Sequence, residues 1–199
     1  MGKAVETRQA IFYAAISLVQ QKGYADTNIV DICEACGITK PTFYYHFKSK
    51  EDIFASMDFH STVDKSVLPM ILRAENPWQQ MNIYMIATLK QFALAYGKEV
   101  LRASVISSIA MGKNPFAFIT PEQSEVTLHL VKKAQEMGIV RNHMKAEDIL
   151  LYSVTMFVGT LLMWVLGDLD GDIYQLEYDA SKAFHDVADE YDFPLDMYK

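Results

Sequence analysis

The 199-residue sequence has little of what several protein classes require. Its two cysteines, Cys33 and Cys36, have no second Cys or His pair at zinc-ligand spacing and follow no predicted strand, so neither a zinc site nor a redox motif is predicted. Nine glycines and six prolines, with no run rich in either, leave no long linker. We therefore expect compact modules that adjoin directly and need no metal or other cofactor.

Catalytic constellations are missing as well. The five histidines are scattered, without a His-x-x-x-His pair, and no glycine-rich phosphate loop follows a predicted strand. No serine or cysteine nucleophile stands out with a matching base. The sequence therefore does not predict an enzyme.

The sequence has no excess of positive charge. Its formal net charge is -7, so any binding of nucleic acid must come from a local patch. Such a patch is present at 39–50, where three lysines occur without an acid.

A secretory signal is not predicted, because the charged residues Lys3, Glu6 and Arg8 precede an amphipathic pattern. The uncharged run 149–167 has the length of a bilayer span, but its acidic flanks and internal hydroxyls disfavour insertion. We expect a cytoplasmic protein without a membrane partner, in which this run is a largely buried helix.

Apolar spacing and capping residues predict an all-α fold of about nine helices. The first three are an N-terminal helix ending at Lys22, a short helix after Asn28 and a third short helix at 39–46. Two short helices joined by a turn that contains glycine, here Gly37, are typical of a helix-turn-helix motif.

A fourth helix is predicted from Ser49 to about Leu68, where Pro69 interrupts it. Later helices are predicted to start at Asn76, Thr120 and Asp172, with breaks at Gly97, 112–115 and Gly138. The predicted domains are a three-helix helix-turn-helix domain at 1–50, of a kind that binds DNA, and a larger helical domain at 51–199, for which the family resemblance described below implies ligand binding and dimerisation.

The third helix combines core aromatics with a polar face. Phe43 and Phe47 can anchor it, while the other side chains are hydroxyl, basic or aromatic. A recognition helix needs this division, since its donors must reach base edges and phosphates.

The run from Gly37 to Ile53, GITKPTFYYHFKSKEDI, resembles the signature of the tetracycline-repressor (TetR/AcrR) family at every fixed position. Upstream of it, Gly23–Ile32 is similar to the segment that precedes this signature in the family. The resemblance implies a transcriptional regulator, most often a repressor, that binds a palindromic double-stranded DNA operator as a homodimer and responds to a small molecule. A helical dimeric ligand-binding or scaffold protein that does not bind DNA is the alternative.

The resemblance also implies which side chains contact DNA, with Lys50 on a phosphate. These are Asn28, Thr39, Lys40, Pro41, Thr42, Tyr44, Tyr45, His46 and Lys50. One departure is Val30, which stands where many relatives have Arg or another polar residue, so a base contact from the second helix is absent or purely apolar.

The last two helices, at 149–167 and 173–191, resemble the family's four-helix dimer interface. The first is more apolar than one partner can bury, and the second has an apolar stripe with Glu177 on its polar side. The predicted interface residues are Val154, Gly159, Leu161, Phe184 and Val187.

Methionine and aromatic residues are plentiful between these regions and suit an adaptable cavity for a small, largely apolar or aromatic effector. The predicted lining residues are Trp78, Met81, Met85, Phe92, Met111, Phe116, Tyr152 and Met156. Plain core positions are the alternative for each of them.

Overall fold

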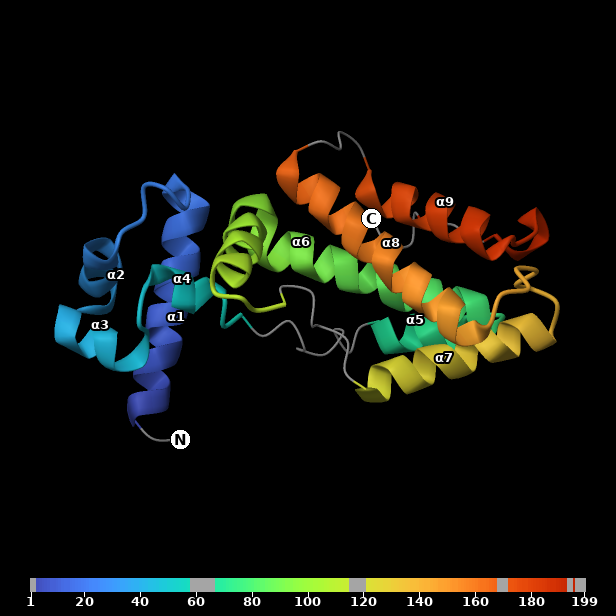
Figure 1. Ribbon diagram of the computed structural model, residues 1–199, viewed down its shortest axis with the longest axis horizontal. Coiled ribbons are helices and arrows are strands. Elements are labelled where there is room, and N and C mark those ends of the chain that lie inside the picture. Colours follow the sequence, from blue (N-terminus) through green and yellow to red (C-terminus); the bar gives the residue numbers. More distant parts are fainter. Residues whose placement is uncertain (1–2, 58–66, 115–120, 168–171, 193–194, 196–199) are drawn as a thin grey trace. The chain divides into compact units, whose positions relative to one another are not determined.

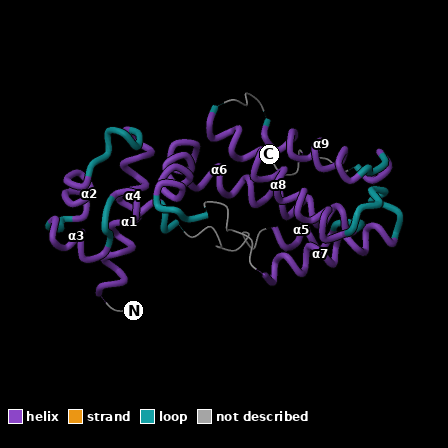
Figure 2. The backbone as a smooth tube through the Cα atoms, in the orientation of Figure 1, coloured by secondary structure: helices purple, strands orange, loops and turns teal. Residues whose placement is uncertain are grey.

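The computed structural model describes residues 3–57, 67–114, 121–167, 172–192 and 195. These residues form nine α-helices and no strand (Figure 2). The predicted all-α class and helix count are therefore confirmed.

The chain divides into two compact units, one of Met1–Phe59 with Leu94–Ala117 and one of His60–Ala93 with Phe118–Lys199. This division differs from the predicted boundary at residue 50. The reason is that helix α4 and the second half of α6 contribute side chains to the core of the first unit.

The first unit contains α1 (Lys3–Lys22), α2 (Ile29–Cys36), α3 (Lys40–His46) and α4 (Lys50–Phe54), coloured blue to teal in Figure 1. Each helix buries its apolar positions in one shared core, which also takes Val100 and Ala103 from α6. The fully buried residues of α1 to α4 are Ile11, Ala15, Val19, Ile32, Phe43, Ile53 and Phe54.

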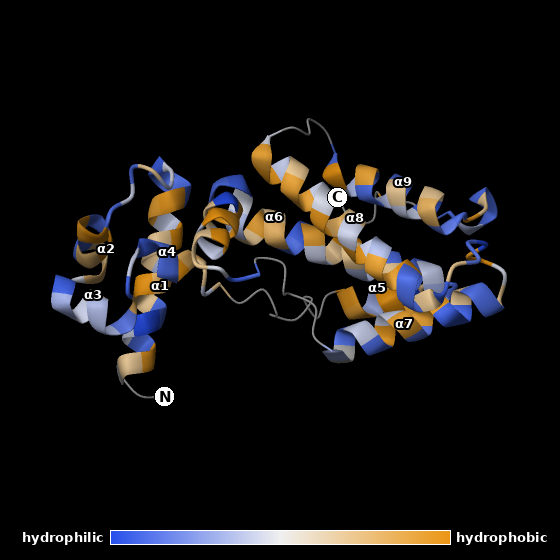
Figure 3. Ribbon diagram, viewed as in Figure 1, coloured by the Kyte–Doolittle hydropathy of each residue, from blue (hydrophilic) through white to orange (hydrophobic). Residues whose placement is uncertain are grey.

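The second unit is built from α5 (Leu68–Arg73), the first part of α6 (Pro77–Ala110), α7 (Pro121–Glu136), α8 (Ala146–Leu166) and α9 (Ile173–His185). Helix α8 contacts both α7 and α9. Within the described ranges it is the one helix long and apolar enough to cross a bilayer, and Figure 3 shows its apolar character.

Two helix boundaries differ from those predicted. Instead of running on to Leu68, α4 ends at Phe54, and α5 begins separately at Leu68 with Pro69 in its first turn, where its missing N–H costs no hydrogen bond. Residues 58–66 between them lie outside the described part of the chain.

The second difference is at α9, which ends at His185 although the sequence predicted a helix to Tyr191. Asp186 adopts a left-handed conformation with φ of 51°. The Arg141 guanidinium favours that turn, because Nη2 lies 2.9 Å from Asp186 Oδ1 and Nε donates to the Asp186 carbonyl at 3.0 Å. A short 3₁₀ turn, Asp189–Tyr191, follows.

Candidate nucleic-acid interface and effector cavity

Helix α2 begins and ends with specific local contacts. The Asn28 side-chain oxygen accepts from the Val30 and Asp31 N–H groups at 2.9 and 3.1 Å, and the Asp31 carboxylate accepts from the Asn28 N–H at 2.9 Å. The two residues thus form a capping box. Gly37 then ends the helix at φ of 63°, a conformation that favours glycine.

Helix α3 follows that turn and starts at Thr39. The Thr39 hydroxyl accepts from the Thr42 N–H at 3.4 Å, and the two hydroxyls lie 3.0 Å apart. Pro41 occupies the first turn, where no intrahelical acceptor is needed. The start of α3 is therefore fixed by its own side chains.

Two phenylalanines orient α3. Phe43 is fully buried and Phe47 nearly so, which turns the opposite face of the helix outward. Tyr44 is 53% exposed and Tyr45 79% exposed. Arg8 of α1 supports the far end, where Nη1 donates to the His46 carbonyl at 2.5 Å and the guanidinium lies 4.0 Å from the centre of the Phe47 ring. A cation at the last carbonyls of a helix also complements its dipole.

The sequence-predicted DNA contacts, apart from Lys50, lie on the surface of the first unit. Asn28, Thr39, Lys40, Pro41, Tyr44 and Tyr45 are exposed, and Thr42 and His46 are half-buried. Val30 is exposed on α2. Asp31, in the first turn of α2, is paired with Lys22 at 2.6 Å, and this hydrogen bond lowers the pKa of the Asp31 carboxyl.

Lys50 has a different environment from the one expected for a phosphate contact. Its ammonium group donates to the backbone carbonyls of Tyr24 and Thr27 at 2.7 and 2.8 Å and lies 3.9 Å from the centre of the Tyr24 ring. Partial burial lowers the pKa of Lys50. Two of its three hydrogens thus join α4 to the segment before α2, and only one is left for a phosphate.

Arg8 and Lys48 were not assigned in the sequence-based site. Arg8 positions the end of α3, a role that depends on contacts between distant residues and has no local signature. Lys48 is exposed between α3 and α4, and its location within the acid-free run 39–50 was the available signal.

The second unit contains a cleft of about 270 Å³ with an almost wholly apolar lining. Ile71, Gln80, Val126 and Leu130 from α5, α6 and α7 line only this cleft. A smaller, more closed chamber of about 20 Å³ adjoins it. The two share Met81, Tyr84, Gln123 and Thr127.

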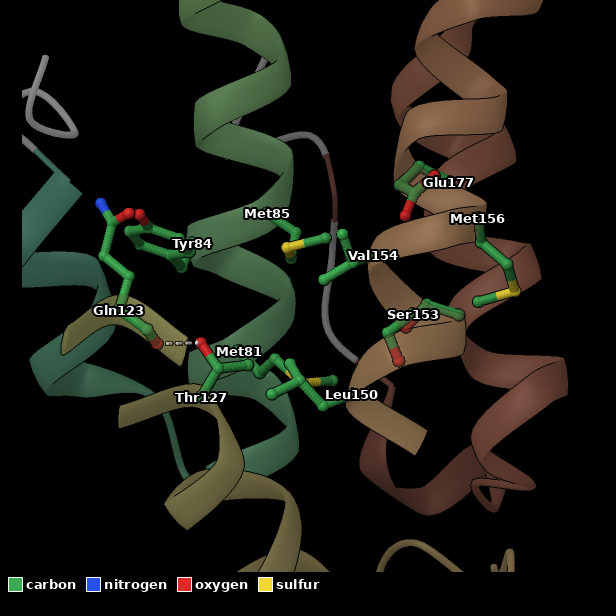
Figure 4. Close-up of a pocket in the computed structure, with 11 residues that line it drawn as sticks. Met81, Tyr84, Met85, Gln123, Thr127, Leu150, Ser153, Val154, Met156 and Glu177 are labelled. Atoms are coloured by element: carbon green, nitrogen blue, oxygen red, sulfur yellow. Dashed lines mark hydrogen bonds between the residues drawn. The ribbon is translucent and has the colours of Figure 1, made fainter. Parts of the chain in front are cut away.

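The chamber extends from α6 and α7 to α8 and α9. Figure 4 shows Met85 of α6 facing Val154 of α8, with Tyr84 and Gln123 on the α7 side. Thr127 donates to the Gln123 carbonyl at 2.9 Å. Of the predicted effector residues, Met81, Met85 and Met156 line the chamber.

The other predicted effector residues that fall within the described ranges line neither space. Trp78 and Phe92 are buried, the former against Tyr178 with ring centres 5.7 Å apart. Tyr152 is 47% exposed beside Phe184, and Met111 belongs to the first unit. Phe116 lies outside the described residues.

A buried carboxylate was missed. Glu177, expected on the polar side of its helix, lines the chamber and is only 2% exposed. Burial raises the pKa of its carboxyl, which a hydrogen bond with the Thr160 side chain partly offsets. Its other oxygen, Oε2, has no hydrogen-bond partner in the described part of the chain.

A buried histidine lies behind the chamber wall. His185 Nδ1 is 2.6 Å from the Ser181 carbonyl oxygen, and Nε2 is 3.1 Å from the Ser153 hydroxyl. Burial lowers the pKa of His185 to about 4, so the imidazole is neutral at pH 7.

The predicted dimer residues are divided between core and surface. Leu161 and Val187 are buried within their own chain, Phe184 packs partly against the same core, and Val154 lines the chamber. Gly159 is half-buried on α8, with nothing within 4 Å of an added Cβ. The outward face of α8 is instead an uncharged stripe whose exposed large side chains are Leu151, Tyr152, Met163 and Leu166.

Known proteins share both sequence and fold with this chain. Residues 11–57 match the bacterial regulatory proteins of the tetR family. A probable acrEF/envCD operon repressor of Escherichia coli K12 is 24% identical over 192 residues, covering 87% of this chain and 83% of the relative.

Solved structures extend the similarity to the C-terminal helices. The fatty acid degradation regulator FadR of Bacillus halodurans has a TM-score of 0.59 at 17% identity, covering 92% of this chain and 95% of that one. FadR of Thermus thermophilus, a TetR-family transcriptional repressor solved with lauroyl-CoA, has a TM-score of 0.60 at 16% identity, covering 89% and 92%. Residues 11–57 thus match the tetR family of bacterial regulatory proteins in sequence, and about nine tenths of the chain shares the fold of these solved regulators.

Proposed function

We propose that the protein is a ligand-responsive repressor that binds a palindromic operator as a homodimer in the cytoplasm. The observation that carries the proposal is the acid-free, exposed face of α3, held outward by Phe43 and Phe47. Lys40, Tyr44 and Tyr45 supply hydrogen-bond donors and aromatic surface on that face, as reading of the major groove requires.

Phosphate contacts are assigned mainly to Lys48 and to the single remaining hydrogen of Lys50. Operator DNA is to be selected from fragments of the source genome and used in titrations at several salt concentrations. Lys48→Ala should weaken binding to all sequences. The slope of the logarithm of the binding constant against the logarithm of the salt concentration should become shallower by about one per subunit contact. Lys133→Ala, which removes an exposed lysine of α7, is the matched control and should leave the slope unchanged.

Base recognition is assigned to Lys40 and Thr42. Their replacement by alanine should change sequence preference, with each base contact contributing about 1 to 3 kcal/mol of discrimination. If Lys40→Ala, Tyr44→Ala and Lys48→Ala all bind operator as tightly as the unaltered protein, the interface is misassigned. If the protein retains no DNA at low salt, the alternative of a helical dimer without DNA binding is favoured.

Dimerisation is assigned to α8 and α9. Because Leu161 and Val187 are already buried, the exposed stripe of α8 replaces them as the contact surface. Met163→Glu should give a monomer in light scattering and lose operator binding. Leu72→Glu, at an exposed leucine of α5, is the control and should remain dimeric.

The effector is assigned to the cleft and chamber of the second unit, and the lauroyl-CoA complex of the Thermus relative supports a small-molecule site in this fold. Effector binding is proposed to lower operator affinity by changing the spacing of the two recognition helices. Reciprocity then requires that operator DNA weaken effector binding by the same factor.

A further inference from the structure

We infer that the effector is a lipophilic amine whose apolar body fills the cleft between α5, α6 and α7 and whose ammonium head enters the chamber to pair with Glu177. The inference rests on the proposed function, since it takes these spaces as the effector site. It adds the charge and the orientation of the ligand.

The carboxylate is the first observation. Glu177 is 98% buried, and its Oε2 atom has no hydrogen-bond partner among the described residues. No ion pair with a Lys, Arg or His is found for it in those residues either. A buried polar atom without a partner costs about 1 to 3 kcal/mol, and more if charged, so a bound donor removes a standing penalty.

The sizes of the two spaces are the second observation. The chamber of about 20 Å³ has room for one group of the size of water, and a primary ammonium is such a group. The adjoining cleft of about 270 Å³ suits an aromatic ring with a short chain. An amphipathic molecule with a compact head therefore matches both.

The walls are the third observation. Hydroxyl oxygens of Ser153 and Ser181 line the chamber with Glu177 and can accept further N–H groups of an ammonium. Met81, shared by both spaces, is a flexible side chain that can move aside for a ligand. The nearby His185 is neutral and does not repel a cation, because burial lowers its pKa to about 4.

The test uses three probes with one skeleton and different heads, namely phenylbutylamine, phenylbutanol and phenylbutyrate. Their affinities for the full-length protein are measured calorimetrically at pH 7. The amine should bind at least about tenfold more tightly than the alcohol, because a hydrogen bond to a charged partner is stronger than a neutral one. The carboxylate probe should bind most weakly.

Two isosteric variants locate the effect. Glu177→Gln should abolish the preference for the amine while leaving alcohol binding within about twofold. Glu136→Gln, which removes an exposed charge from α7, should keep the preference and so controls for net charge. Thermal unfolding of both variants establishes that they fold.

Equal affinity for amine and alcohol in the unaltered protein overturns the inference, because a buried water would then be enough to hydrogen-bond Glu177 Oε2. This outcome does not depend on whether Glu177→Gln folds. An amine preference that persists in a folded Glu177→Gln protein also overturns it. Neither result affects the regulator function, which is tested by operator binding. Amine binding that leaves operator affinity unchanged contradicts the effector mechanism but not the charge assignment.

Discussion

The two units bury different kinds of side chain. In the described residues, the first unit has a core of aliphatic and aromatic groups, and its buried polar side chains are hydroxyls. The second unit buries amide, carboxyl and imidazole groups, namely Asn76, Gln79, Asn82, Glu177 and His185. It also holds the cleft and chamber. The difference shows that one unit presents a fixed outer face while the other keeps polarity and space inside.

The largest expected effect is a loss of folding stability in the first unit. Phe43→Ala should destabilise it by about 3 to 5 kcal/mol, because a fully buried ring is removed from beneath the recognition helix. Tyr45→Ala on the exposed side of α3 should change stability by no more than about 0.5 kcal/mol. Denaturant unfolding followed by circular dichroism measures both. Equal losses would mean that α3 is not anchored through Phe43.

A slightly smaller effect is the pH dependence of stability, which should differ between the two units because His185 is in the second. His185 has an ordinary pKa of 6.5 and a folded pKa of about 4, so the unfolded chain binds more protons in that window. Stability of the second unit should therefore fall by about 3 kcal/mol as the pH drops from 6.5 to 4. Urea unfolding at both ends of the window measures this loss. His185→Gln should remove most of it.

Glu177 contributes to the pH dependence of stability with a sign opposite to that of His185. Because burial raises its folded pKa above the ordinary value of 4.5, its protonated form favours folding at low pH, and that contribution is lost as the pH rises. Glu177→Gln should therefore increase the loss of folding stability that protonation of His185 causes as the pH falls. A flatter pH dependence in this variant would contradict the assigned direction.

The smallest effect compares two glycines. Gly37→Ala should cost about 1 to 2 kcal/mol, because Gly37 has φ of 63° and alanine is strained there. Gly159→Ala, in the interior of α8 with open space around an added Cβ, should stabilise the isolated chain by about 0.5 to 1 kcal/mol. Thermal unfolding of both variants checks the opposite signs. If Gly159→Ala instead lowers the thermal stability, and more so at higher protein concentration, Gly159 lies where two chains approach closely in a dimer.

Local chemistry explains what the sequence could predict. Asn28, Thr39 and Asp172 are caps whose bonds reach only two or three residues along the chain, so these helix starts were predictable. The left-handed glycine after α2 was predictable for the same reason. The polar face of α3 followed from the spacing of Phe43 and Phe47.

Contacts between distant segments explain what could not be predicted. Lys50 bonds to carbonyls more than twenty residues away, and the turn that ends α9 is bonded to Arg141, 45 residues earlier in the chain. Helix α8 is apolar on nearly all sides, so its sequence does not tell which leucines are buried in their own chain. Glu177 could have been suspected, since its spacing of four from Ile173 and Ser181 puts it on their buried face.

The burial of Trp78 has a spectroscopic consequence. Both tryptophans of the chain, Trp78 and Trp164, belong to the second unit, while the first contains tyrosine and phenylalanine only. Selectively excited indole emission therefore originates from the second unit alone. Trp78 sits in that core against Tyr178, so a shift of its emission to longer wavelength signals water entering the core of that unit. Light emission from the unaltered chain can thus report the melting of one unit without a label.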